Sequence, residues 1–80
     1  MLLGRLGVFR VRVPEALSDR TIAETHIRRD TGCTVIALSV DGTMQVNPDS
    51  HLPMQVNAEL LLIGSRSGQE RFFEIYVGDG

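Results

Sequence analysis

The chain has 80 residues, enough for one small domain but too few for a large hydrophobic core. Hydrophobic residues make up 42% of it and charged residues 22%, which is typical of a globular chain and excludes a disordered one. The formal net charge of −2 argues against a nucleic-acid partner or an anionic membrane surface, and no stretch reaches the length of a membrane span.

The first predicted element is a strand. Met1–Gly7 is expected to be a linker that leads into a single domain over residues 8–80. Val8–Val13 alternates apolar side chains with Arg10 and Arg12, and this period of two predicts a strand with one buried face. A solvated strand face explains the two arginines better than an anion site does.

A short helix is predicted next. Thr21-Ile22-Ala23-Glu24 has the pattern of a capping box, and Gly32 is expected to end the helix. Cys33 is the only cysteine, which excludes an internal disulfide and fits a reducing cytoplasm. No histidine–acid pair stands near it in the sequence, which favours a small buried residue over a nucleophile.

The run Thr34–Val46 predicts a central hairpin. Its first half is almost all β-branched or aliphatic, and Asp41-Gly42 is the dipeptide that a two-residue type I′ turn prefers. This turn pairs Val40 with Thr43, Leu38 with Gln45 and Ala37 with Val46. Simple alternation then places on one face Ile36, Leu38 and Val40, and on the other Val35, Ala37, Met44 and Val46. Both faces are apolar, so we expect a partner outside the chain to cover one of them.

The remaining elements complete an α+β pattern. Asn47–Pro53 is expected to cross without regular structure, and Glu59–Ser65 to form a second strand that is apolar on both faces. Ser67–Glu70 has the pattern of another capping box, opening a terminal helix that Gly78 ends. The turn around Gly64–Gly68 needs no phosphate to explain it. The predicted fold is a small two-layer sandwich of a mostly antiparallel β-sheet with two short helices.

No catalytic or metal-binding motif stands out. The acidic residues are scattered, without a close pair in an apolar frame for acid–base chemistry. His26 and His51 have no second histidine at ligand spacing, and Cys33 has no C-x-x-C partner. We therefore expect no enzyme, no catalytic residue and no metal, but a module that associates with itself.

The order and spacing of these segments resemble the TrkA-C domain, also called the RCK C-terminal domain. The resemblance covers Val8 to Tyr76. It rests on the residues Thr21-Ile22-x-Glu24, Arg28, Gly32, Val35–Leu38, Gly42, Pro48 and the acidic-Leu-Leu-x-x-Gly strand at Glu59–Gly64. One departure is Ala58-Glu59, where the family often has Gly-Asp.

The resemblance implies a cytoplasmic regulatory domain of a potassium channel or cation transporter. Such a domain forms a homodimer, and a small ligand at or near the dimer cleft shifts the dimer geometry and so controls gating. A nucleotide-binding Rossmann domain and a membrane channel or transporter subunit would be its partners, and nucleic acid would not. The alternative is a ligand-free dimerisation module of a larger transport protein such as a cation/proton antiporter.

The resemblance gives the candidate ligand-binding residues Ile22, Arg28 and Val35, and His26 and Arg29 are further candidates because they could hold an anion together with Arg28. Some family members bind cyclic di-AMP through a pattern of aliphatic residues, Asp, Arg and Asn. Arg28 matches this pattern, but His26 stands in the place of the Asp and Thr34 in that of the Asn, and Ala23 is smaller than the pattern expects. These departures argue against cyclic di-AMP and leave open another small anionic or nucleotide ligand. No cofactor is expected within the domain itself.

Overall fold

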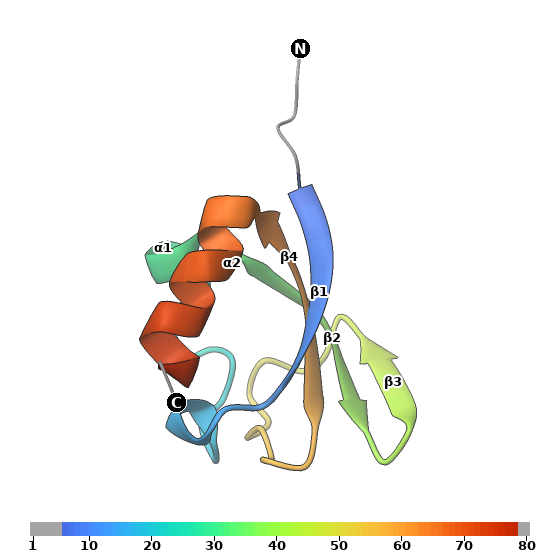
Figure 1. The fold of residues 1–80 in the computed structure, drawn as a ribbon. Coiled ribbons are helices and arrows are strands. Elements are labelled where there is room, and N and C mark those ends of the chain that lie inside the picture. Colours follow the sequence, from blue (N-terminus) through green and yellow to red (C-terminus); the bar gives the residue numbers. More distant parts are fainter. Residues whose placement is uncertain (1–5, 79–80) are drawn as a thin grey trace.

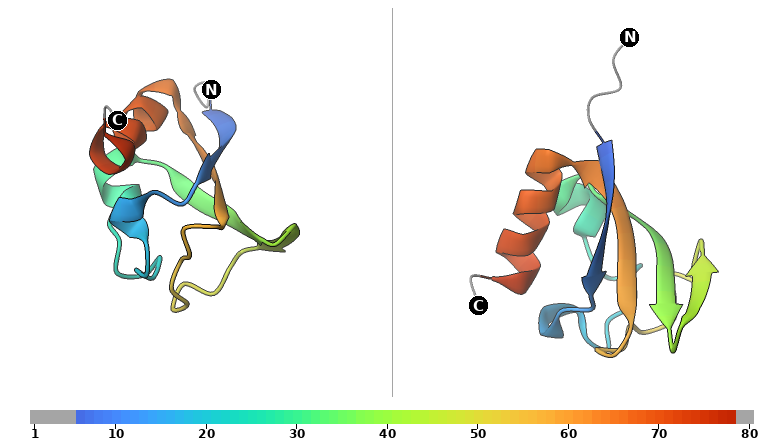
Figure 2. Two further views of the ribbon diagram at one scale, coloured as in Figure 1. Left: turned by 60° about the horizontal axis from the view of Figure 1, so that its bottom comes forward. Right: turned by 45° about the vertical axis from the view of Figure 1, so that its right-hand side comes forward.

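Four antiparallel strands form one sheet, with the helices packed against one of its faces (Figure 1, Figure 2). The computed structural model describes residues 6–78. The strands lie in the order β1-β4-β2-β3, with bounds β1 Leu6–Arg12, β2 Thr34–Val40, β3 Thr43–Val46 and β4 Glu59–Ser65. The helices are η1 Glu15–Leu17 (a 3₁₀ turn), α1 Ile27–Thr31, α2 Arg66–Phe72 and η2 Phe73–Val77 (a π-helical continuation of α2). The predicted α+β class and two-layer arrangement are confirmed.

The central hairpin has the predicted register. Asp41 and Gly42 both have positive φ, 51° and 80°, as a type I′ turn requires. The turn pairs Val40 with Thr43, and the rest of the β2–β3 ladder follows from it, down to the pair of Ala37 with Val46. The turn dipeptide thus fixed every cross-strand pair of this hairpin.

A β-bulge interrupts the pairing of β2 with β4. Val35 lies opposite Leu62, but the next pair is Ala37 with Leu61, so Ile36 is an extra residue in β2. An extra residue reverses the alternation of side chains between the two halves of a strand. The pleat of β2 therefore differs on the two sides of Ile36.

The bulge makes one face assignment wrong. Val35 packs against the core on the helix side, together with Leu38 and Val40, whereas Ile36 is half-buried and takes no part in that cluster. The predicted grouping of Ile36 with Leu38, and of Val35 with Ala37, fails because simple alternation does not hold across a bulge. The sequence gives no sign of the bulge, since every side chain around it is apolar.

The first capping box forms, but the helix does not start there. The backbone N–H of Thr21 donates to Glu24 Oε1 at 2.9 Å, and the N–H of Glu24 donates to Thr21 Oγ1 at 3.1 Å. Only one turn follows, and α1 begins six residues later, after His26 with φ −113° and ψ 36°. The capping box thus stabilises an isolated turn. Gly32 ends α1 with φ 79°, as predicted.

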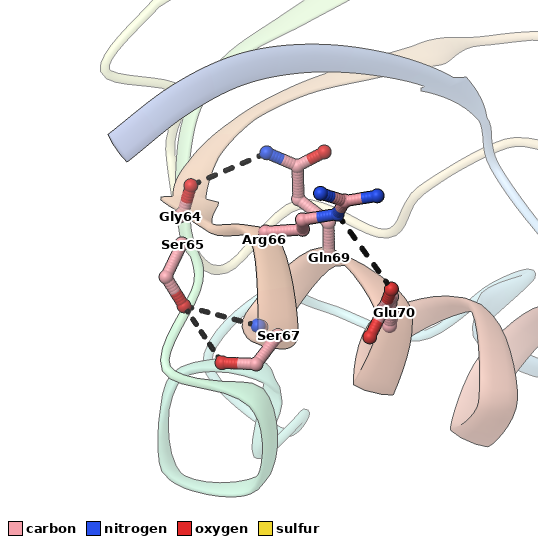
Figure 3. A network of polar contacts seen from close by, with 7 residues as sticks. Gly64, Ser65, Arg66, Ser67, Gln69 and Glu70 are labelled. Carbon is pink, nitrogen blue, oxygen red and sulfur yellow. Dashed lines mark hydrogen bonds and ion pairs between the residues drawn. The ribbon is translucent and has the colours of Figure 1, made fainter. Parts of the chain in front are cut away.

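The N-cap of the terminal helix lies two residues before the predicted one. Ser65 is the N-cap, and its Oγ accepts a hydrogen bond from the N–H of Gly68 at 3.1 Å (Figure 3). Gln69 Nε2 donates to the carbonyl of Gly64 at 3.3 Å, which ties the first turn of α2 back to β4. Gly78 ends the helix, as predicted.

The core lies between the sheet and the helices. Its largest fully buried side chains are Phe72, Leu17, Met54, Leu60, Leu62 and Cys33. Phe72 of α2 packs against Phe9 of β1 in an edge-to-face pair with ring centroids 5.9 Å apart. Residues 47–53 cross without regular structure, as predicted, apart from a single bridge between Thr21 and Pro53.

Two further observations concern the ends and the membrane. β1 includes Leu6 and Gly7, which the sequence predicts to be part of a linker, and residues 1–5 lie outside the described part of the chain. Across residues 6–78, no helix has the length and apolar character needed to span a bilayer.

Candidate functional site

A cavity of about 180 Å³ lies beside α1, at the start of β2. Its walls come from three consecutive pieces of chain, which are the isolated turn, α1 and the first residues of β2. The lining residues are Ile22, Thr25, Ile27, Arg28, Cys33, Thr34 and Val35. All of them lie within 14 positions of sequence, so local structure alone determines how the cavity is shaped.

The corner between α1 and β2 positions the far wall of the cavity. Thr31 is buried at the end of α1, where its Oγ1 donates to the Ile27 carbonyl at 2.6 Å and accepts from the N–H of Cys33 at 3.0 Å. Gly32 reverses the chain between these two bonds in the left-handed conformation. The threonine hydroxyl both donates and accepts within the corner, so it supports the wall of the cavity and is not among its lining residues.

The isolated turn supplies the near wall. The hydroxyl of Thr25 donates to the Ile22 carbonyl at 2.8 Å, and the capping box holds the start of the same turn. Both residues reach the cavity from this turn, although neither belongs to a helix. The capping box therefore contributes to the site even though it starts no helix.

The chemistry of the cavity is mostly apolar with one cationic group. Aliphatic side chains and the buried Cys33 form the walls, while Thr25, Thr34 and Arg28 supply the polar groups. Arg28 is exposed and makes no ion pair with any residue between 6 and 78. An unpaired guanidinium at the edge of an apolar cavity can donate two parallel hydrogen bonds to a phosphate or carboxylate.

Three of the five candidate ligand residues meet in this cavity. Ile22, Arg28 and Val35 line it together, whereas His26 and Arg29 do not. His26 is the exposed residue that precedes α1, and Arg29 Nε lies 3.3 Å from Oδ1 of Asp30. Neighbouring residues on a helix point in directions about 100° apart, which explains why Arg28 and Arg29 differ.

Four lining residues were missing from the sequence-based set. Thr25 lies three positions before Arg28, a spacing that places two side chains close together on a turn, and this signal could have suggested it. In the sequence, Thr34 is a departure from the cyclic di-AMP pattern and gives no other sign of a site. Ile27 and Cys33 carried no such signal, because a buried apolar residue is equally well explained by the core. In residues 6–78, no three His, Cys, Asp or Glu side chains gather where a metal ion could bind.

A sequence model of the TrkA-C domain matches residues 7–76. The chain belongs to the TrkA-C domain family. Comparison with curated proteins gave no match. The TrkA-C fold is shared with the RCK C domain of the potassium transport protein KtrA, a structure solved in complex with cyclic di-AMP. The TM-score is 0.78 and the sequence identity 19%, and the match covers 84% of this chain and 79% of the KtrA chain.

Two other proteins share this TrkA-C fold. The RCK domain of GsuK matches with a TM-score of 0.76 and 32% identity over 86% of this chain, and the chain spans only 16% of the GsuK chain. The GsuK channel is also described bound to NAD. The RCK_C domain dimer of S. agalactiae BusR, in complex with cyclic di-AMP, matches with a TM-score of 0.80 and 19% identity over 95% of this chain and 96% of that one.

One comparison bears on the expected partners. BusR has also been solved with its promoter DNA, in a chain of which this TrkA-C domain covers 36%, at 18% identity. A TrkA-C fold therefore occurs within a DNA-binding protein. The expectation that this chain has no nucleic-acid partner rests on its charge and stays a prediction.

Proposed function

We propose that this TrkA-C domain is a ligand-sensing regulatory domain on the cytoplasmic face of a potassium channel or cation transporter. In this proposal the regulatory unit is the expected domain of residues 8–80 together with Leu6 and Gly7, which belong to β1, and the domain catalyses no reaction. The observation that carries the proposal is the cavity beside α1, where one unpaired arginine meets an apolar wall. The family membership and the potassium transport proteins with the same fold support it.

The size of the cavity supports a dimeric site. Pockets that enclose a whole drug-sized ligand measure about 300–1,000 Å³, whereas this cavity measures about 180 Å³. One protomer therefore offers room for a single base or anionic group of a larger ligand. A second copy related by a two-fold axis would supply the other half and a second Arg28.

The ligand class follows from the groups that line the cavity. Arg28 favours an anion, and the aliphatic walls favour a flat apolar group, a combination that suits a nucleotide or another small organic anion. The similar structures are described with cyclic di-AMP or with NAD. For this chain we propose a ligand other than cyclic di-AMP, because His26 lies outside the cavity and Thr34 offers a hydroxyl where the pattern has an amide.

Ligand binding would act on gating through the dimer. A ligand that prefers one of two dimer geometries shifts the balance between them by the difference in its two affinities. A Rossmann nucleotide-binding domain and a membrane subunit of the parent protein would receive that change. The second candidate function is a ligand-free dimerisation module, which the exposed apolar side chains of Val8, Met44 and Val46 on the sheet favour.

Isothermal titration calorimetry of the 80-residue chain tests the proposal. The titrants are ATP, NAD, inorganic phosphate and cyclic di-AMP, and the variants are Arg28→Ala and Arg29→Ala. The two arginines are adjacent on α1, both are exposed, and only Arg28 lines the cavity.

We expect one of the first three titrants to bind the wild type and Arg29→Ala, and not to bind Arg28→Ala. Equal loss in both variants would show that general positive charge, rather than the cavity, holds the anion. Binding of cyclic di-AMP alone would overturn the proposed ligand class. No binding by any titrant would favour the dimerisation module.

A further inference from the structure

The cavity beside α1 (Figure 1) has a polar rim and an apolar interior. Its two exposed lining residues, Arg28 and Thr34, both carry polar side chains. Its two most deeply buried lining residues are Ile27, 3% exposed, and Cys33, 0% exposed, and neither has an oxygen or nitrogen atom in its side chain. The half-buried aliphatic residues of the lining are Ile22 and Val35. A ligand therefore meets a charged group at the rim and hydrocarbon further in.

The hydroxyl groups around the interior already have partners within the protein. Thr25 Oγ1 donates its proton to the carbonyl of Ile22 at 2.8 Å. Thr31 Oγ1 donates to the carbonyl of Ile27 and accepts from the N–H of Cys33. Among residues 6–78, no buried side-chain oxygen or nitrogen lacks a hydrogen-bond partner. The side-chain donor that remains free in the interior is the weak S–H group of Cys33.

The volume of the cavity limits its occupant to one ring or a short branched chain. The cavity measures about 180 Å³, and an apolar cavity of about 150 Å³ is enough to hold a benzene molecule. A nucleobase is of similar size, so volume alone does not decide between them. Polarity does, because every base carries hydrogen-bond donors and acceptors along its edge. Burying such groups without partners weakens binding.

We propose that the cavity binds a small amphipathic anion with a hydrocarbon group, either an aromatic ring or a short branched chain. The hydrocarbon group enters the interior, and the phosphate or carboxylate meets Arg28 at the rim, where the guanidinium can donate two parallel hydrogen bonds to either anion. This inference rests on the proposed ligand-sensing function and narrows its ligand class, because it excludes a nucleobase from the interior.

Phosphate esters with different organic groups test this inference, because the anionic group is a phosphate in each. The probes for isothermal titration calorimetry of the 80-residue chain are inorganic phosphate, 4-methylphenyl phosphate, 4-hydroxyphenyl phosphate and AMP. The methyl and hydroxyl groups are nearly equal in size, so the two aryl phosphates differ mainly in the need for a hydrogen bond at the far end of the ring. Arg28→Ala and Arg29→Ala are the matched variants, since only Arg28 lines the cavity.

We expect 4-methylphenyl phosphate to bind at least about tenfold more tightly than inorganic phosphate, because burial of the ring adds to the contact with Arg28. 4-Hydroxyphenyl phosphate should bind about ten- to a hundredfold more weakly than the methyl compound, since its hydroxyl loses water and gains no partner. AMP should bind no more tightly than inorganic phosphate. Arg28→Ala should abolish binding of the aryl phosphates, and Arg29→Ala should leave their dissociation constants within about twofold.

Nuclear Overhauser effects locate the ring without changing the protein. In the complex with 4-methylphenyl phosphate, we expect contacts between the ring protons and the methyl groups of Ile22 and Val35, which come from the turn and from β2 on two sides of the cavity. No aromatic residue lines the cavity, so the aromatic signals of the ligand are distinct there.

Two kinds of failure are distinguishable. The inference is overturned, and the proposed function stands, if inorganic phosphate binds through Arg28 but the methyl compound binds no more tightly than phosphate or the hydroxyl compound. AMP binding more tightly than the aryl phosphates, or a bound ring without contacts to Ile22 and Val35, overturns it in the same way. If none of the four probes binds, the inference and the ligand-sensing function fail together.

Discussion

Gly64→Ala is expected to destabilise the domain through a contact visible in the structure. A Cβ at Gly64 would lie 2.5 Å from Sγ of Cys33 and 3.3 Å from its Cα. The sulfur is fully buried, and the Cα belongs to the rigid corner between α1 and β2, so neither atom can move away freely. Overpacking of a core in this way costs about 1–3 kcal/mol. For a small domain each kcal/mol lowers the Tm by about 4–8 °C.

A double-mutant cycle isolates this contact. Cys33→Ala removes the sulfur and therefore the 2.5 Å contact, but it leaves the 3.3 Å approaches to the Cα and Cβ atoms of this residue. Urea unfolding of the wild type, Gly64→Ala, Cys33→Ala and the double variant should give a favourable coupling free energy of about 1 kcal/mol or more between the two positions.

Gly7→Ala is the matched control for this cycle. Gly7 lies opposite Gly64 in the β1–β4 ladder, and a Cβ there would lie 3.1 Å from Gln69 Nε2, at the end of a long side chain whose hydrogen bond to the Gly64 carbonyl is already 3.3 Å long. Its cost should stay below about 1 kcal/mol. Additive effects in the cycle, or a Gly64→Ala variant as stable as the wild type, would refute the close approach of β4 to the corner.

Three further predictions concern single positions. Gly42→Val should lower the Tm by several degrees. The backbone of Gly42 has φ 80°, and nothing lies within 4 Å of a Cβ added there, so backbone strain alone is responsible. A smaller loss for Gly42→Asn would confirm this cause, and equal losses for the two variants would contradict it. Ser65→Ala should lower the free energy of unfolding in urea by about 0.5–2 kcal/mol, because it removes the N-cap hydrogen bond from the N–H of Gly68. Ser67→Ala should lower it much less. A larger loss for Ser67→Ala than for Ser65→Ala would show that Ser67 is the N-cap, as the capping-box pattern predicts. Burial, and secondly the charge of Asp30, raise the pKa of the Tyr76 hydroxyl above its usual 10.0. The folded state therefore holds this proton more tightly than the unfolded state, so the free energy of unfolding should fall as the pH rises beyond 10. If Tyr76→Phe showed the same fall, the assignment to Tyr76 would be refuted.

Turn chemistry made parts of the fold predictable from the sequence. Asp41-Gly42 determines the hairpin, because few residue pairs accept two positive φ angles and the register then follows residue by residue. Gly32 and Gly78 end helices with positive φ for the same reason. Where one local rule decides the backbone, the sequence is sufficient.

The helix starts were harder to predict, because several residues compete for the same role. The Thr21 capping box forms its two bonds, but the hydroxyl of Thr25 bonds back to Ile22 and the backbone leaves the helical region at His26. At the second helix, Ser65 and Ser67 can both serve as the cap. Packing of α2 against the α1 corner, where Gly68 lies beside Thr31, favours the earlier start.

The candidate site was only partly predictable. Arg28 and the aliphatic residues Ile22 and Val35 came from the family resemblance and meet in the cavity. Arg29 was a candidate because its charge could hold an anion together with Arg28, but a helix turns adjacent side chains apart. The buried wall at Cys33 depends on the approach of β4 to the corner, a tertiary contact that no local pattern encodes.

One strand carries both the cavity wall and the bulge. Val35 lines the cavity, and the next residue, Ile36, is the extra residue of β2. The carbonyl of Ile36 accepts a hydrogen bond from the N–H of Asn47 at 2.9 Å, which fixes the bulge to the end of the hairpin. The Asp41-Gly42 turn sets the register of that hairpin, so the turn and the bulge together determine that Val35 lies on the helix side of the sheet, where the cavity is.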